Sequence, residues 1–100
     1  MQKLVETRTL EIDAKVTGGV KLPRAVILYT VDAEHFVLAA EPLKALEEGA
    51  LTKTRVAVVT RQGKNVIKLP LKVYNFYHLD ECDYTIMASD KDPGTVIIRV

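Results

Sequence analysis

The chain has 100 residues, of which 48% are apolar, and its 14 basic and 13 acidic side chains nearly balance. This length supports one hydrophobic core, so we expect a single barrel domain over residues 1–100. The single cysteine excludes an intramolecular disulfide, and no charged-then-apolar leader or long apolar run is present, which favours a cytoplasmic protein with no membrane contact.

Residues 10–16 alternate strictly between apolar and polar side chains. This period of two is typical of a strand with one face in a core and the other in water. Gly18 and Gly19 follow, and glycine supplies the positive φ angles of a tight reversal. We therefore predict a hairpin whose second strand is Val20–Leu22.

Pro23 cannot donate a ladder hydrogen bond and suits a first helical turn, so it predicts the end of that strand and a short helix over residues 24–29. A strand is expected over Glu34–Ala40. The segment 41–49 looks locally helical and ends in glycine, which makes it the predicted crossover, residues 41–50, between two halves of the chain.

The second half predicts a hairpin of residues 56–60 and 65–69 around Arg-Gln-Gly-Lys. A short aromatic helix, residues 71–79, is expected after Pro70, with Val73, Phe76 and Tyr77 at helical spacing. Strands over 84–88 and 95–100 complete the elements.

The two halves repeat one pattern. Thr-Arg-Thr at 7–9 returns as Thr-Lys-Thr at 52–54, and Lys-Leu-Pro ends at both Pro23 and Pro70. Tyr29 corresponds to Tyr77 beyond the prolines. We interpret this as a duplication of two ββαβ repeats, about 3–40 and 51–100, which predicts a mainly β, pseudo-two-fold-symmetric barrel of six or more strands and a monomer in solution.

Charge is uneven along the chain. Residues 53–79 hold six basic side chains and no acidic one, whereas residues 80–92 hold five acids and one lysine. A local positive field can therefore exist in a nearly neutral protein, although solubilising surface charge is the alternative. The six basic residues are Lys53, Arg55, Arg61, Lys64, Lys68 and Lys72.

The last 45 or so residues run through a basic turn, Val-Ile-Lys-Leu-Pro, a short helix and Asp83 before a strand. This order of elements resembles the AbrB/SpoVT swapped-hairpin family. His78 and Cys82 stand where that family has glycines, and the helix is aromatic rather than charged. With two copies in one chain, the whole resembles an internally duplicated cradle-loop barrel, closest in layout to the archaeal RIFT barrels.

The resemblance implies a transcriptional regulator that binds double-stranded DNA, with basic side chains neutralising phosphates along one cradle face. The basic residues at matching positions are Arg61, Lys64, Lys68 and Lys72 in the second copy and Lys15, Lys21 and Arg24 in the first. Two other functions stay open. One is a non-catalytic protein-interaction barrel resembling the N-terminal domains of archaeal AAA ATPases, and the other is a nucleotide-binding enzyme resembling archaeal riboflavin kinases.

Catalytic and metal chemistry have little support in the residues, and we expect no cofactor. A structural zinc site offers more Cys and His at paired spacing than this chain does. A lone cysteine such as Cys82 is more often a small packed residue than a nucleophile. The residues considered for a metal site were His78, Asp80, Cys82 and Asp83.

Overall fold

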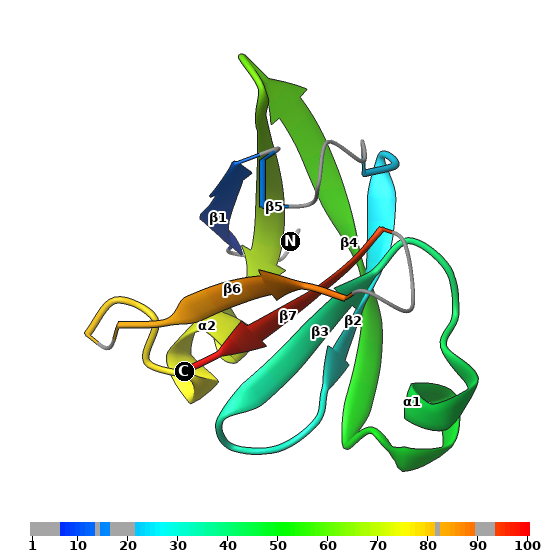
Figure 1. Ribbon diagram of the computed structural model, residues 1–100. Coiled ribbons are helices and arrows are strands. Elements are labelled where there is room, and N and C mark those ends of the chain that lie inside the picture. The colour runs from blue at the N-terminus through cyan, green and yellow to red at the C-terminus, as the bar shows by residue number, and fades with distance from the viewer. Residues whose placement is uncertain (1–6, 14, 17–21, 82, 90–93) are drawn as a thin grey trace, which may run out of the picture.

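The computed structural model describes residues 7–13, 15–16, 22–81, 83–89 and 94–100. In this part of the chain seven antiparallel strands form one sheet in the order β1-β5-β4-β2-β3-β7-β6, curled into a nearly closed barrel (Figure 1). The mainly β prediction is confirmed. The elements are β1 (Thr7–Asp13), β2 (Ala25–Thr30), β3 (His35–Ala39), α1 (Lys44–Gly49), β4 (Thr52–Arg61), β5 (Lys64–Pro70), α2 (Leu71–Phe76), β6 (Thr85–Ala88) and β7 (Thr95–Arg99).

The longest strand, β4, belongs to both parts of the sheet. Its residues 52–57 pair with β2, and its residues 58–61 pair with β5. On one side, β5 continues to β1, and on the other side β2 continues through β3 and β7 to β6. β4 therefore joins a three-stranded part to a five-stranded part (Figure 1).

The β4–β5 hairpin closes in the tightest way available to two strands. Arg61 lies opposite Lys64, which leaves a two-residue loop. Gln62 and Gly63 have φ angles of 49° and 77°, so both central residues are left-handed, as a type I′ turn requires. The predicted hairpin of residues 56–60 and 65–69 is confirmed.

Alternate positions of every strand but β6 contribute fully buried side chains to the barrel interior, and Ile86 of β6 packs against them. A second, smaller cluster lies on the outer face of β2 and β3, where Tyr29 and Val37 pack against Leu43 and Leu46 of the α1 region. The Tyr29 hydroxyl accepts a hydrogen bond from the Leu43 backbone N–H at 3.2 Å. The interior strand residues are Leu10, Ile12, Val26, Leu28, Phe36, Leu38, Val56, Val58, Ile67, Leu69, Val96 and Ile98.

The predicted helix after Pro23 is wrong, because residues 25–30 form the strand β2. Val26 and Leu28 point into the barrel, whereas Ile27 and Tyr29 join the outer cluster under α1. A strand covered on both faces has apolar residues at consecutive positions, and such a run cannot be told from a short helix by its periodicity.

The predicted strands at 34–40, 84–88 and 95–100 are confirmed as β3, β6 and β7, and the crossover helix is confirmed as α1. Two-repeat symmetry and the ββαβ pattern are not confirmed, since Pro23 precedes a strand and Pro70 precedes a helix. The turn at Gly18 and Gly19 and most of the predicted strand 20–22 lie outside the described residues.

The predicted helix after Pro70 is confirmed as α2, although it ends at Phe76. Phe76 is 52% exposed, contrary to the expectation that it would pack inward with Val73. Tyr77 is 1% exposed, and its ring lies 4.7 Å from that of Phe36 in the barrel interior. The side chain that anchors α2 is therefore the one just after the helix.

The Tyr77 hydroxyl donates to the backbone carbonyl oxygens of Asp32 and His35, at 2.9 Å each. Asp32 lies in the turn between β2 and β3, and His35 is the first residue of β3. The carboxylate of Asp32 accepts backbone N–H bonds from Glu34 and His35 in the same turn. These bonds tie the turn to a residue more than 40 positions away, so Tyr77 fixes α2 against the end of the barrel.

We predict that Tyr77→Phe lowers the free energy of unfolding by about 1–2 kcal/mol, because the Asp32 carbonyl loses its donor, whereas the His35 carbonyl keeps the backbone N–H groups of Val31 and Asp32. Urea denaturation measures this loss. Tyr74→Phe is the matched control, since Tyr74 is half-buried and its hydroxyl has no hydrogen bond within the described residues. Equal losses in the two variants would contradict the role given to the Tyr77 hydroxyl.

The same variant has a signature in alkaline solution. Burial, and then the charge of Asp32, raises the pKa of Tyr77 from 10.0 to about 12. The unfolded chain therefore loses this proton at lower pH than the folded chain, and the wild-type free energy of unfolding falls as the pH rises from about 10 to about 12. Tyr77→Phe lacks this ionisable hydroxyl, so its free energy of unfolding should fall less than that of wild type as the pH rises from about 10 to about 12.

His78 follows α2 with a left-handed φ of 52°, a conformation that favours glycine after a helix. We predict that His78→Gly raises the free energy of unfolding by about 0.5–1 kcal/mol, because it removes the steric cost of a Cβ there. Glu81→Gly is the control in the same loop, at an exposed position without a positive φ, and thermal denaturation should show it to be destabilising. A destabilised His78→Gly protein would contradict this interpretation.

Candidate nucleic-acid interface

The β4–β5 hairpin gathers basic side chains on its outer face. In the middle of β4 and along β5 the inward positions are buried, and the alternate outward positions are mostly exposed. Arg61 and Lys64 are directly opposite each other at the tip, and Lys68 lies four residues further along β5. Arg55 occupies the same face of β4 as Arg61, six residues earlier. We call these four residues, Arg55, Arg61, Lys64 and Lys68, the basic face.

Acidic side chains of β1 border the basic face. Glu11 and Asp13 of β1 lie opposite Val66 and Lys64 of β5. The Lys64 Nζ is 3.8 Å from Glu11 Oε2, a long contact between two side chains that are both more than half exposed. Such an exposed pair contributes little, so the positive charge of Lys64 stays available to a polyanion.

Three of the other predicted contact residues lie within the described part of the chain. Lys15 lies in the turn after β1, where its backbone N–H donates to Asp13 Oδ1. Arg24 precedes β2, and Lys72 lies on α2, at the barrel end opposite the hairpin tip. Lys21 lies outside the described residues. Three of the seven predicted residues, Arg61, Lys64 and Lys68, therefore share one surface.

Sequence reasoning missed Arg55. Its position in the acid-free run was visible, but no motif of the resembled family falls on it. The signal that could have found it is the period of two along β4, because Arg55, Ala57, Val59 and Arg61 alternate with buried Val56 and Val58.

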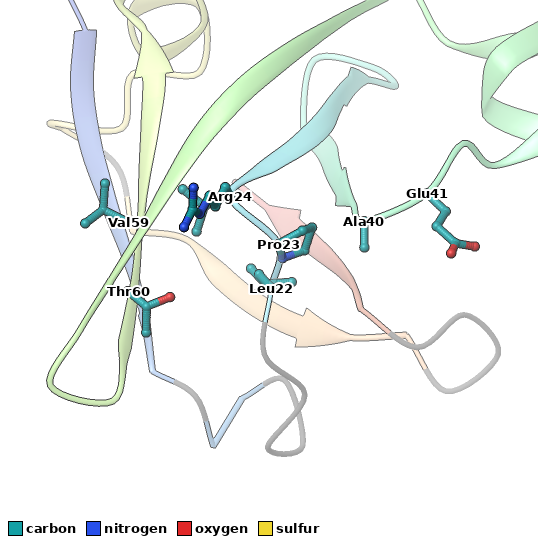
Figure 2. A pocket seen from close by; sticks show the side chains of 8 residues that line it. Leu22, Pro23, Arg24, Ala40, Glu41, Val59 and Thr60 are labelled. Atoms are coloured by element: carbon teal, nitrogen blue, oxygen red, sulfur yellow. The ribbon is translucent and has the colours of Figure 1, made fainter.

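A depression of about 800 Å³ opens where β4 leaves β2. Leu22, Pro23 and Arg24 line one side, Ala40 and Glu41 another, and residues 58–60 of β4 the third (Figure 2). Figure 2 shows Arg24 and Glu41 on opposite sides of this depression. Its described lining thus holds one positive and one negative side chain that do not meet, and it concentrates no charge.

Three titratable residues, Asp32, His35 and Tyr77, meet at the β2–β3 turn. His35 Nδ1 is 2.9 Å from Asp32 Oδ1. The Glu34 backbone N–H, followed by the His35 side chain, lowers the pKa of Asp32. Every one of these groups is used to hold the β2–β3 turn. The cluster has no nucleophile beside it within the described residues, so it is a structural network.

Two further properties concern metal binding and membrane crossing by the part of the chain that the structure describes. It contains no group of three or more His, Cys, Asp or Glu side chains able to hold a metal ion. It also contains no helix with the length and apolar character needed to cross a membrane.

Comparisons with protein-family models, curated proteins and solved structures find no match to this chain, so its function is argued from its own residues.

Proposed function

We propose that this protein binds double-stranded DNA through the basic face of the β4–β5 hairpin, as a small transcriptional regulator of the AbrB type. The observation that supports the proposal is the gathering of four exposed cations on the outer face of β4 and β5. Exposed cations on one surface can neutralise the phosphates of duplex DNA, so the charge of this face is compatible with that ligand.

The dimensions agree with a contact to one DNA strand. From Arg55 to Arg61 the strand rises by about 20 Å, at about 3.3 Å per residue. Phosphates of one strand follow one another about every 3.4 Å along the helix axis, so about six phosphates face this length. Four cations can neutralise about four of them. Lys72 lies at the other end of the barrel, so the proposed contact includes Arg55 in its place.

We also propose that the protein is of the AbrB type and that its chain arose by internal duplication. Both proposals are supported by the repeated Lys-Leu-Pro motif and by the barrel. The left-handed φ of His78 adds support, since the resembled family has glycine at that position and glycine adopts such angles without cost.

For wild-type protein and mixed-sequence duplex, we predict that log affinity falls with log salt at a slope of about −3 to −4, at about 0.9 per phosphate contact. Replacing Arg61 and Lys64 with alanine should flatten the slope by about two units. Glu11→Gln should strengthen binding, because it removes the carboxylate beside Lys64. Fluorescence anisotropy across a salt series measures all three.

Lys44→Ala is the control for this series, since it removes one exposed positive charge from α1, away from the hairpin. It should leave the slope unchanged. If wild-type protein fails to bind duplex at low salt, the DNA proposal is wrong. If the double variant binds as well as wild type, the contact lies on another face.

A second candidate function is a non-catalytic protein-interaction module. Within the described residues β6 pairs only with β7, and the exposed side chains of Tyr84 and Met87 lie just before and on β6. A partner strand could add to such an edge through backbone hydrogen bonds. The absence of duplex binding would favour this candidate.

We propose that the protein is a monomer in dilute solution, because one chain supplies both halves of a nearly closed barrel. Sedimentation velocity over a hundredfold range of protein concentration should give one species of about 11 kDa. A dimer that persists at the lowest concentration would mean that a strand or hairpin is exchanged between chains.

A further inference from the structure

A second cavity, of about 400 Å³, lies at the barrel end opposite the hairpin tip. It is bounded by the end of β2, the start of β4 and the first turns of α2. We call it the mouth cavity. Its lining residues are Leu28, Thr30, Leu51, Thr52, Lys53, Thr54, Pro70, Lys72, Val73 and Phe76.

The mouth cavity collects apolar surface that the fold leaves in water. Of the four large apolar side chains that are exposed in the described part of the chain, two line it: Leu51 at 66% and Phe76 at 52%. Leu28 and Val73 lie deeper, packed against the core. Apolar side chains that converge on a concave site in the mouth of a barrel are typical of a small-molecule site.

The charge at the rim is positive. Lys53 and Lys72 both line the cavity, but the Lys53 Nζ is 2.8 Å from Glu47 Oε2, which neutralises it. No carboxylate in the described residues forms an ion pair with Lys72, so its charge is uncompensated. The cavity thus has one net positive charge above an apolar lining.

Hydroxyl groups complete the polar part of the lining. The hydroxyls of Thr30 and Thr52 are hydrogen bonded to each other across β2 and β4. The Thr54 hydroxyl, two positions along β4, has no hydrogen bond to another described residue and is exposed. It can therefore donate to a bound oxygen atom.

We propose that the mouth cavity binds a small organic carboxylate with an apolar body. The apolar body covers Leu51, Phe76 and Val73, and the carboxylate binds the Lys72 ammonium group and the Thr54 hydroxyl. An anion of this kind compensates the charge of Lys72 and covers the exposed apolar surface. This site is separate from the basic face, so the inference does not rest on DNA binding.

Octanoate is a suitable probe, and its titration into ¹⁵N-labelled full-length protein can be followed by amide chemical shifts. We expect saturable shifts centred on Leu28, Thr54 and Val73, with a Kd on the order of a millimolar for a ligand of this size. Octylammonium, which has the same chain length and the opposite charge, should bind at least about tenfold more weakly. Shifts that do not saturate, or that spread through the whole core, would overturn the proposal.

Lys72→Ala should weaken octanoate binding about tenfold, and Lys72→Arg should retain it. Lys68→Ala is the matched control, because it removes the same charge from the basic face. It should leave octanoate binding unchanged while it flattens the salt slope with DNA. Equal octanoate affinity of Lys72→Ala and wild type would contradict the assigned carboxylate contact.

A third variant tests the cavity itself. Thr54→Phe fills the space between β4 and α2, and it should abolish octanoate binding while the amide spectrum stays dispersed. A folded Thr54→Phe protein that binds octanoate as wild type does would place the ligand elsewhere.

Discussion

The structure depends on one constraint, that a single strand satisfies two different partners along its length. The first six residues of β4 bond to β2 and the last four bond to β5. The change of partner brings the two parts of the sheet together around one interior. It also opens the depression beside Arg24 where β4 leaves β2, and the mouth cavity lies where β4 begins. Both cavities and the basic face are consequences of the path of this strand.

The positive charge gathers on the outer face of β4 and β5, which is one of the parts of the sheet that stay in water. The inward positions form the core, and the outer face of β2 and β3 is covered by α1 through Leu43 and Leu46. Charged side chains are excluded from both places by the cost of desolvation. The outer face of the hairpin is thus one surface where a run of basic residues with no acid among them can stand in water.

Several of the parts of the fold that the sequence predicted have one face in water. Residues 10–13 alternate because their polar side chains are solvated, and Gln-Gly at 62–63 marks the hairpin turn because both angles are positive. The strand at 25–30 was missed because its two faces are both covered, which removes the alternation. The mouth cavity could not be found from the sequence, since it depends on register and on segments that are distant in the chain. Lys72 was noticed for its charge, but its place on α2, away from the hairpin tip, depends on the same long-range packing.

The tight turn at Gln62 and Gly63 has an electrostatic consequence for the hairpin tip. It holds Arg61 and Lys64 directly opposite each other, and like charges at such positions repel. The long contact from Lys64 to Glu11 offsets little of this repulsion. Asp13 of β1, which lies opposite Lys64, offsets a further part of it, and an anion seated between Arg61 and Lys64 would reduce the remaining repulsion in addition to making new contacts. Added salt then has two opposite effects, since it screens the repulsion between Arg61 and Lys64 in the unbound protein and also weakens their attraction to any polyanion.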